Sequence, residues 1–304
     1  MLVTGARGFV GRHLLARLAI DLPAADVRAL AADLTDAAAV AAEVRAFAPD
    51  ACLHLAAVSA VSAASHNPGR AWQVNLHGTL HLARAIMAET PDCLLVFASS
   101  ADCYGGSFRS GVALTEAAVL APLSTYAATK AAADLALGAM VADGLRCVRA
   151  RPANHTGPGQ SEEFVIAAFA RQIARVRAGL QPPVLRVGAL EHRRDFLDVR
   201  DVCRAYVACL RRADDIPAGA IINVASGHPR RIGDILERLM ASAGVTARIE
   251  TDPARLRHGE IAVAATDATS GRELLGWSPA VAWDVTIADV MADWFRRAAT
   301  PHPG

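Results

Sequence analysis

No apolar run in this sequence is long enough to cross a membrane, although 53% of its 304 residues are hydrophobic. Leu94–Ala98 is typical of the longest runs and falls far short of the roughly 20 residues that a membrane-spanning helix needs. Near the amino terminus, Gly5 and Arg7 stand where a signal peptide would carry an uninterrupted apolar segment. We therefore expect a cytoplasmic protein with no membrane partner.

An excess of charge of either sign is also lacking, as are the cysteine patterns that bind zinc. The formal net charge of +1 provides no global electrostatic footprint for nucleic acid, whereas small anionic ligands remain possible. The six cysteines include no Cys-x-x-Cys pair and no histidine at a zinc-ligand spacing, so we expect no metal site. We expect most of these cysteines to be buried apolar residues of a protein in a reducing compartment.

Up to about residue 150, short β-branched segments alternate with longer alanine-rich ones. This alternation predicts a doubly wound α/β domain of the Rossmann type, with helices on both faces of a parallel sheet. The predicted strands cover residues 1–4, 27–30, 51–55, 94–99 and 146–151, and the predicted helices cover residues 11–20, 36–47, 68–89 and 124–143.

After Arg151, prolines and glycines punctuate shorter segments and arginine becomes frequent, which predicts a smaller α/β lobe. No linker separates the two parts, so we expect them to pack closely and to bind the ligand in the cleft between them. The predicted Rossmann domain comprises residues 1–152 and 195–224, and the predicted substrate-binding lobe comprises residues 153–194 and 225–304.

A glycine-rich turn, Gly5-x-x-Gly8-x-x-Gly11, directly follows the first predicted strand and opens the first helix. Its glycines let the backbone approach a pyrophosphate, and the helix amino terminus offers free N–H groups, so the turn predicts dinucleotide binding. No acidic residue ends the second strand, and Asp33, which comes later, is better placed for the adenine ring. Arg7 and Arg28 either meet a 2′-phosphate or are solvated, so NADPH and NADH both remain candidate cofactors.

Tyr126 and Lys130 lie four residues apart in a predicted helix, so their side chains leave the same face. A phenol has a pKa near ~10 and is a poor acid–base catalyst at neutral pH unless a nearby cation stabilises its phenolate. Lys130 supplies that cation. Together with the glycine turn, the pair predicts a nicotinamide-dependent oxidoreductase.

These residues resemble the extended short-chain dehydrogenase/reductase family, of the NAD-dependent epimerase/dehydratase type. In that family a hydroxyl at the end of the preceding strand completes the catalytic group, and Ser100 matches it; alternatively, Ser100 only caps a turn. The resemblance implies that Asn75 helps to hold Lys130, although alone it would be an ordinary polar helix residue, and His54 a satisfied core histidine. The cofactor-binding residues so implied are Gly5, Arg7, Gly8, Phe9, Val10, Gly11, Asp33, Leu34, Leu55, Ala56, Ala57, Asn75, Ser99, Tyr126, Lys130 and Arg151.

Five segments carry a further resemblance: Arg151–Gln160, Phe164–Ile166, Arg194–Asp201, Asn223–Gly227 and Leu275–Pro279. They resemble the branch of this family that acts on nucleotide sugars, in particular its reductases of GDP-linked 4-keto-6-deoxy sugars. The guanidinium groups of Arg194 and Arg257 suit pyrophosphate oxygens, and Glu260 suits ribose hydroxyls, whereas we expect Arg193 and Arg200 to be solvated or ion-paired. Relatives tend to place a proline where this chain has His258, which leaves the shape of that loop open. The implied substrate-binding residues are Asn154, Val165, Arg194, Arg257 and Glu260.

Several reactions share this pattern of residues. Related 4,6-dehydratases place a glutamate two residues after the catalytic hydroxyl, sometimes with an aspartate before it, and here these positions hold Asp102 and Ala101. The shorter carboxylate favours reduction of the C4 ketone to GDP-D-rhamnose or its C4 epimer, but a dehydratase or an epimerase remains the alternative. A non-catalytic nucleotide sensor would normally lack the Tyr/Lys pair.

The mechanism that the resemblance implies needs one hydride and one proton. Tyr126 protonates the new alkoxide, Ser100 binds the same oxygen, Lys130 lowers the tyrosine pKa and binds the nicotinamide ribose, and Asp102 orients the sugar. The family further implies a homodimer through a four-helix interface built from the helices predicted over residues 68–89 and 124–143.

Overall fold

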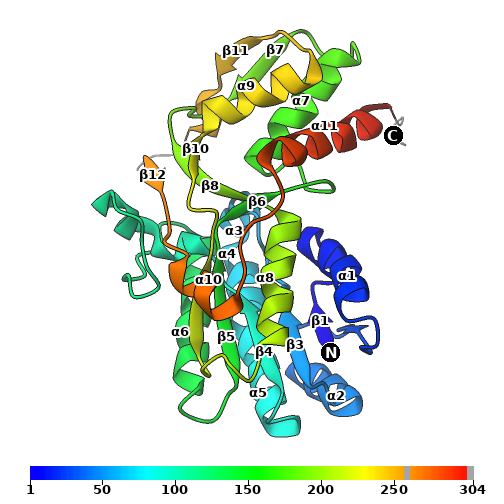
Figure 1. The fold of residues 1–304 in the computed structure, drawn as a ribbon, viewed down its shortest axis with the longest axis vertical. Coiled ribbons are helices and arrows are strands. Elements are labelled where there is room, and N and C mark those ends of the chain that lie inside the picture. Colours follow the sequence, from blue (N-terminus) through cyan, green and yellow to red (C-terminus); the bar gives the residue numbers. More distant parts are fainter. Residues whose placement is uncertain (257–260, 300–304) are drawn as a thin grey trace.

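A computed structural model describes residues 1–256 and 261–299 as two lobes, one above the other (Figure 1). The larger lobe is built on a six-stranded parallel sheet in the order β2-β1-β3-β4-β5-β9, which confirms the predicted fold class. The strands are β1 (Leu2–Thr4), β2 (Arg28–Ala29), β3 (Ala51–His54), β4 (Leu94–Ala98), β5 (Cys147–Pro152) and β9 (Ala220–Val224).

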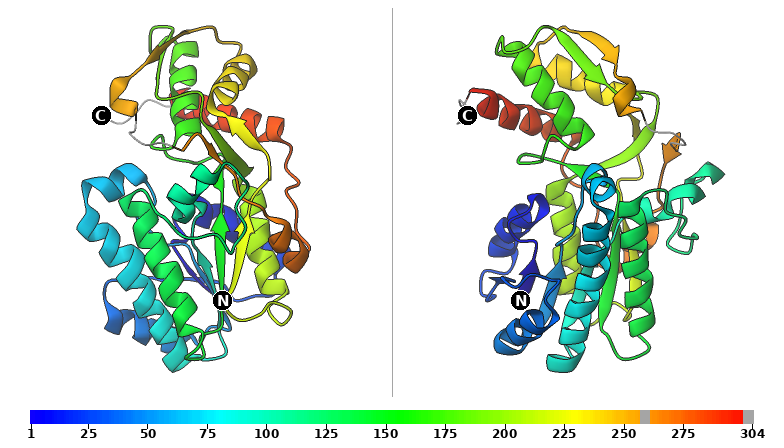
Figure 2. Two further views of the ribbon diagram at one scale, coloured as in Figure 1. Left: turned by 90° about the vertical axis from the view of Figure 1, so that its left-hand side faces the viewer. Right: turned by 180° about the vertical axis from the view of Figure 1, so that it is seen from behind.

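Helices cover both faces of this sheet (Figure 2) because successive residues of each strand point to opposite sides. Val3 and Leu53 pack on the side of α1 and α8, whereas Leu2 and Cys52 pack on the side of α2, α5 and α6. The helices of this lobe are α1 (Phe9–Asp21), α2 (Ala37–Phe47), α3 (Val61–His66), α4 (Pro68–Trp72), α5 (Thr79–Glu89), α6 (Thr125–Met140) and α8 (Val199–Arg211), with the π-helix η1 (Gln73–Gly78) and the 3-10 helix η2 (Ala101–Ser110).

The smaller lobe has its own apolar core between α7, α9 and α11, which includes Phe196 and Trp294. Its strand β8 pairs with β10, β12 and β6, and β7 pairs with β11. The elements are β6 (Asn154–Thr156), α7 (Val165–Arg177), β7 (Val184–Val187), β8 (Arg193–Asp198), β10 (Pro229–Arg231), α9 (Ile232–Ala243), β11 (Arg248–Thr251), η3 (Pro253–Arg255), β12 (Val263–Ala264), α10 (Thr269–Leu275) and α11 (Trp283–Ala299).

Four details depart from the sequence-based expectation. Residues 68–89 form α4, η1 and α5 in succession rather than one α-helix, and α3 had not been predicted. Residues 195–198 lie in β8 of the smaller lobe rather than in the Rossmann domain. Conversely, Leu275 and Trp277 pack into the core beneath α8, because α10 returns to the larger lobe.

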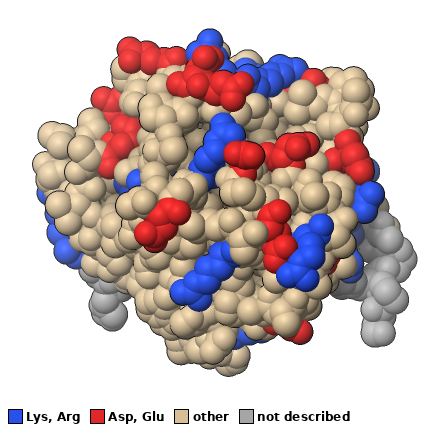
Figure 3. Space-filling view, turned by 90° about the horizontal axis from the view of Figure 1, so that it is seen from below, with Lys and Arg blue, Asp and Glu red and all other residues tan. Residues whose placement is uncertain are grey.

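The surface and the cysteines agree with the composition. Acidic and basic side chains alternate on the face of the larger lobe that lies opposite the smaller lobe (Figure 3). All six cysteines are buried and unpaired. In the described ranges, no helix is both long enough and apolar enough to span a bilayer.

Candidate active site

The sheet brings most of the predicted site residues to one edge. In parallel strands all carboxyl ends share an edge, and Thr4, His54 and Phe97 lie in register on β1, β3 and β4. The segments that follow these strands are the glycine turn, residues 55–58 and residues 99–102. The strand order reverses direction between β1 and β3, where ligands of open α/β sheets bind.

The glycine turn has the close packing that a diphosphate cradle requires. Gly5 adopts a φ of 66°, and a Cβ there would lie 2.8 Å from the Ala56 nitrogen. A Cβ on Gly11 would lie 2.7 Å from the Ala6 Cα. Gly8 precedes α1 without any side-chain cap, so the first-turn N–H groups remain available to phosphate oxygens. These features fit a dinucleotide.

A buried chain of hydrogen bonds supports this turn from below. Thr4 Oγ1 accepts from the Leu55 and Ala56 nitrogens and therefore donates to His54 Nδ1 at 2.7 Å. His54 Nε2 then donates to Thr79 Oγ1 at 2.9 Å. Burial lowers the pKa of His54 to about 3, so the ring is neutral. The core-histidine interpretation is confirmed; Thr4 and Thr79, which the sequence interpretation missed, complete the chain.

Asn75 belongs to the same network, because the Thr79 hydroxyl donates to its backbone carbonyl oxygen at 2.7 Å. Its amide exchanges hydrogen bonds with the Val58 backbone, at 2.8 and 3.2 Å, and donates to Thr129 Oγ1 at 2.9 Å. Asn75 is 1% exposed, so its side chain fixes the loop after β3 to the catalytic helix rather than touching a cofactor. The π-helix η1 aims it there, as such bulges often do at functional sites.

Ser100 and Tyr126 meet at the carboxyl end of β4. Ser100 caps η2 by accepting from the Asp102 nitrogen at 3.1 Å, as the turn-capping interpretation expects, and its hydroxyl lies close enough to Tyr126 to influence the tyrosine pKa. Burial and then the nearby Asp102 carboxylate raise the pKa of Tyr126 well above its usual value, and the Ser100 hydrogen bond opposes them. The pKa of Tyr126 is therefore raised in the structure, whereas the sequence interpretation predicted that it would be lowered.

Lys130 lies one turn beyond Tyr126 and is 3% exposed. Its Nζ sits 4.1 Å from the centroid of the Phe97 ring. Burial lowers the pKa of Lys130 to about 8, opposed by Asp134. The lysine is thus held inside the lobe, against an aromatic face.

Arg151 and Ser99 are not placed as predicted, because both turn to a buried carboxylate. Arg151, 2% exposed, donates to Asp134 from Nε at 2.9 Å and Nη2 at 2.8 Å, and to the Tyr104 hydroxyl at 3.1 Å. Ser99 donates to Asp134 at 2.6 Å. The side chain of Arg151 is therefore structural rather than cofactor-binding. Asp134, two turns after Tyr126 on the same face, had been overlooked.

Beyond the carboxyl end of β2, Asp33 is exposed and accepts from the Thr35 nitrogen and hydroxyl at 2.9 and 2.8 Å, which lowers its pKa. Leu34 is buried beside Gly78. Arg7, within the glycine turn, is exposed. Arg28, however, pairs with Leu2 at the start of β1, so it lies at the opposite edge of the sheet and cannot meet a 2′-phosphate.

Of the predicted substrate residues, Asn154 and Arg194 lie on the paired strands β6 and β8, and Val165 begins α7 with 37% exposure. Arg257, Glu260 and His258 fall outside the described residues. Arg200 is ion-paired with Asp198 and Asp289, at 2.7 and 2.8 Å, as expected. Arg193 is exposed.

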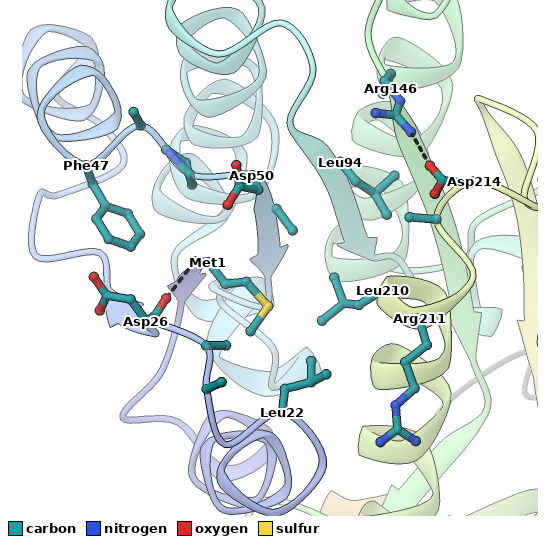
Figure 4. Close-up of a pocket in the computed structure, with 16 residues that line it drawn as sticks. Met1, Leu22, Asp26, Phe47, Asp50, Leu94, Arg146, Leu210, Arg211 and Asp214 are labelled. Carbon is teal, nitrogen blue, oxygen red and sulfur yellow. Dashed lines mark hydrogen bonds and ion pairs between the residues drawn. The ribbon is translucent and has the colours of Figure 1, made fainter.

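A hollow of about 590 Å³ lies at the amino edge of the sheet, away from all of these residues (Figure 4). Met1 and Asp50, which precede β1 and β3, line it together with Phe47, over whose ring Arg28 stacks at 4.4 Å. Because it contains none of the predicted catalytic groups, it is not the candidate active site.

Comparisons with known proteins show which family this chain is similar to. The model of the NAD dependent epimerase/dehydratase family matches residues 1–225. GDP-6-deoxy-D-mannose reductase of Pseudomonas aeruginosa is 37% identical, over 98% of this chain and 97% of that protein. RMD from Pseudomonas aeruginosa complexed with NADPH has a TM-score of 0.87 at 34% identity, covering 97% and 99% of the two chains. Thermus thermophilus UDP-glucose 4-epimerase in complex with NAD has a TM-score of 0.83 at 28% identity, covering 98% and 99%.

Proposed function

Because the chain belongs to the NAD-dependent epimerase/dehydratase family of extended short-chain dehydrogenases/reductases, we propose that it reduces a GDP-linked 4-keto-6-deoxy-mannose at C4. The product is GDP-D-rhamnose or its C4 epimer. The observation that carries this proposal is the proximity of Ser100 and Tyr126 at the carboxyl edge, in a chain similar over nearly its whole length to a GDP-6-deoxy-D-mannose reductase.

The family is NAD-dependent, which confirms the expected nicotinamide cofactor; NADPH and NADH both stay in the proposal. The reduced nicotinamide supplies the hydride. The N–H groups around Gly5, Gly8 and Gly11 would hold the diphosphate of the cofactor, Asp33 would hold its adenosine part, and Lys130 would bind the nicotinamide ribose.

Tyr126 and Ser100 carry out the proton transfer in this mechanism. A phenol with a raised pKa keeps its proton at neutral pH, so it suits the reductive direction, in which Tyr126 O–H donates to the nascent C4 alkoxide. The Ser100 hydroxyl hydrogen-bonds the same oxygen. Asn154, Val165 and Arg194 bind the sugar nucleotide, with Arg257 and Glu260 completing the set.

Asp102 decides between reduction and its alternative. Its carboxylate lies close enough to Tyr126 to raise the phenol pKa, and its neighbour Ala101 adds no second acid. We assign Asp102 to orienting the sugar. A GDP-mannose 4,6-dehydratase or a nucleotide-sugar epimerase would instead use it for proton transfer and would recycle bound NAD.

The experiment that tests the function supplies GDP-4-keto-6-deoxymannose with NADPH or NADH and follows absorbance at the reduced nicotinamide band and product configuration by NMR. We expect stoichiometric cofactor oxidation and a rhamno or talo product. Turnover of GDP-mannose with no net cofactor consumption would assign the dehydratase. Tyr126→Phe should abolish turnover and leave cofactor binding nearly unchanged; retained turnover would remove Tyr126 from the proton-donor role.

We further propose a cytoplasmic homodimer in which α4–α5 and α6 of each subunit form a four-helix interface. Leu135 on α6 is 59% exposed, which suits a contact with a second copy. Equilibrium sedimentation that returns only monomer would refute this arrangement.

A further inference from the structure

We propose that Phe97 is a positioning residue of the reaction, whose ring face holds the Lys130 ammonium in place beneath Tyr126. The assignment of Lys130 to catalysis rests on the proposed function, whereas the contact between Phe97 and Lys130 does not. Phe97 is fully buried on β4, three residues before Ser100, and its ring centroid lies 4.1 Å from Lys130 Nζ. Such a distance allows a cation–π interaction, which is strongest where water is excluded.

The strand geometry explains why the ring faces this lysine. Leu95 and Phe97 share the face of β4 that packs against α6, whereas Val96 points to α8. His54 lies beside the ring on β3, with centroids 5.6 Å apart, and its neutral state adds no second positive charge there. Phe97 therefore lies close to both Lys130 and the buried histidine.

Other groups around Lys130 do not replace this support. Cys103 and Asp134 are the other groups whose negative charge would favour the Lys130 ammonium. Asp134 on the same helix attracts it, but that carboxylate is bonded to Arg151, Arg149 and Ser99. Burial raises the pKa of Cys103, on η2, to about 12, so this thiol stays neutral where the lysine titrates. The electron-rich ring face is the remaining attractive contact.

The sequence makes the contact measurable, because Lys130 is its only lysine. Protein grown on ¹⁵N,¹³Cε-labelled lysine, with a lysine-free tag, gives a single lysine side-chain system in the NMR spectrum. Its titration reports the pKa of Lys130 without substrate or cofactor, and burial places the wild-type midpoint at about 8.

Removing the aromatic face should lower this midpoint. We expect Phe97→Leu to shift it down by about one unit, which at pH 8 reduces the charged fraction from about one half to about one tenth. Phe169→Leu is the matched control, because Phe169 is also buried but belongs to the core of the smaller lobe. Replacing Phe97 by pentafluorophenylalanine keeps the ring shape and withdraws its negative face, so it should lower the midpoint even if Phe97→Leu folds poorly.

An unchanged midpoint with pentafluorophenylalanine would overturn the proposal, as would an equal fall in Phe169→Leu. In the reductase assay, the alkaline limb of kcat/KM should move to lower pH in Phe97→Leu and stay in place in Phe169→Leu. If no keto-sugar is reduced but the lysine midpoint moves, the proposed function fails and the contact stands. If reduction occurs and the lysine midpoint does not move, the proposed function stands and the role of Phe97 fails.

Discussion

Replacing Asp134 should destabilise the larger lobe more than most single substitutions. Its carboxylate is fully buried and accepts from Ser99 at 2.6 Å, from Arg151 at 2.8 and 2.9 Å, and from Arg149 at 3.3 Å. Asp134→Leu leaves the buried Arg151 guanidinium without a counter-charge, which costs about 3–5 kcal/mol. At roughly 2–4 °C per kcal/mol for a chain of this size, the melting temperature should fall by on the order of 10 °C.

The assay is thermal and urea unfolding followed by circular dichroism, with Arg151→Met and the double variant as controls. Asp134→Leu together with Arg151→Met replaces the charged pair by apolar groups of similar size, so it should be more stable than either single variant. A free energy of unfolding for Asp134→Leu within about 1 kcal/mol of the wild type would refute the reasoning. Strict additivity in the double variant would refute it equally.

Two further predictions concern the cofactor edge. In Gly11→Ala, the new Cβ would overlap the Gly5 carbonyl oxygen and lie 2.7 Å from Ala6 Cα, so NADPH should bind at least about tenfold more weakly in a fluorescence titration; an unchanged Kd would contradict the cradle. The folded pKa of His54, about 3, lies below its unfolded value, so only the unfolded state gains this proton as pH falls from about 6.5 towards 3. Stability should therefore decrease by up to about 1.4 kcal/mol per pH unit in that window, and His54→Gln should show a shallower dependence in urea unfolding; equal slopes would count against a buried neutral histidine.

The sequence predicted what depends on local spacing. Alternation placed the first five strands to within a residue or two, and the four-residue separation placed Tyr126 and Lys130 on one helix face. It failed where the partner comes from far along the chain: Arg151 binds Asp134 and Tyr104, which lie on α6 and η2.

Other misses have different physical causes. Of the two roles left open for Arg28, the exposed one fits its pairing with Leu2, and a motif does not say which end of a strand carries a residue. The raised pKa of Tyr126 arises from burial, which no spacing reveals. The contact of Phe97 with Lys130 likewise required knowledge of which face of β4 meets α6.

Because α10 returns to the larger lobe, the two lobes cannot be separated by one cut in the chain. After β9 the chain builds β10, α9 and β11 in the smaller lobe, packs Trp277 beneath α8, and only then forms α11. The indole Nε1 donates to the Asp201 carbonyl at 3.0 Å, and the Asp201 carboxylate accepts from the Ala280 and Val281 nitrogens. The smaller lobe therefore cannot be exchanged as an independent unit. Grafting it onto another Rossmann domain would also require a core in that domain that accommodates Trp277.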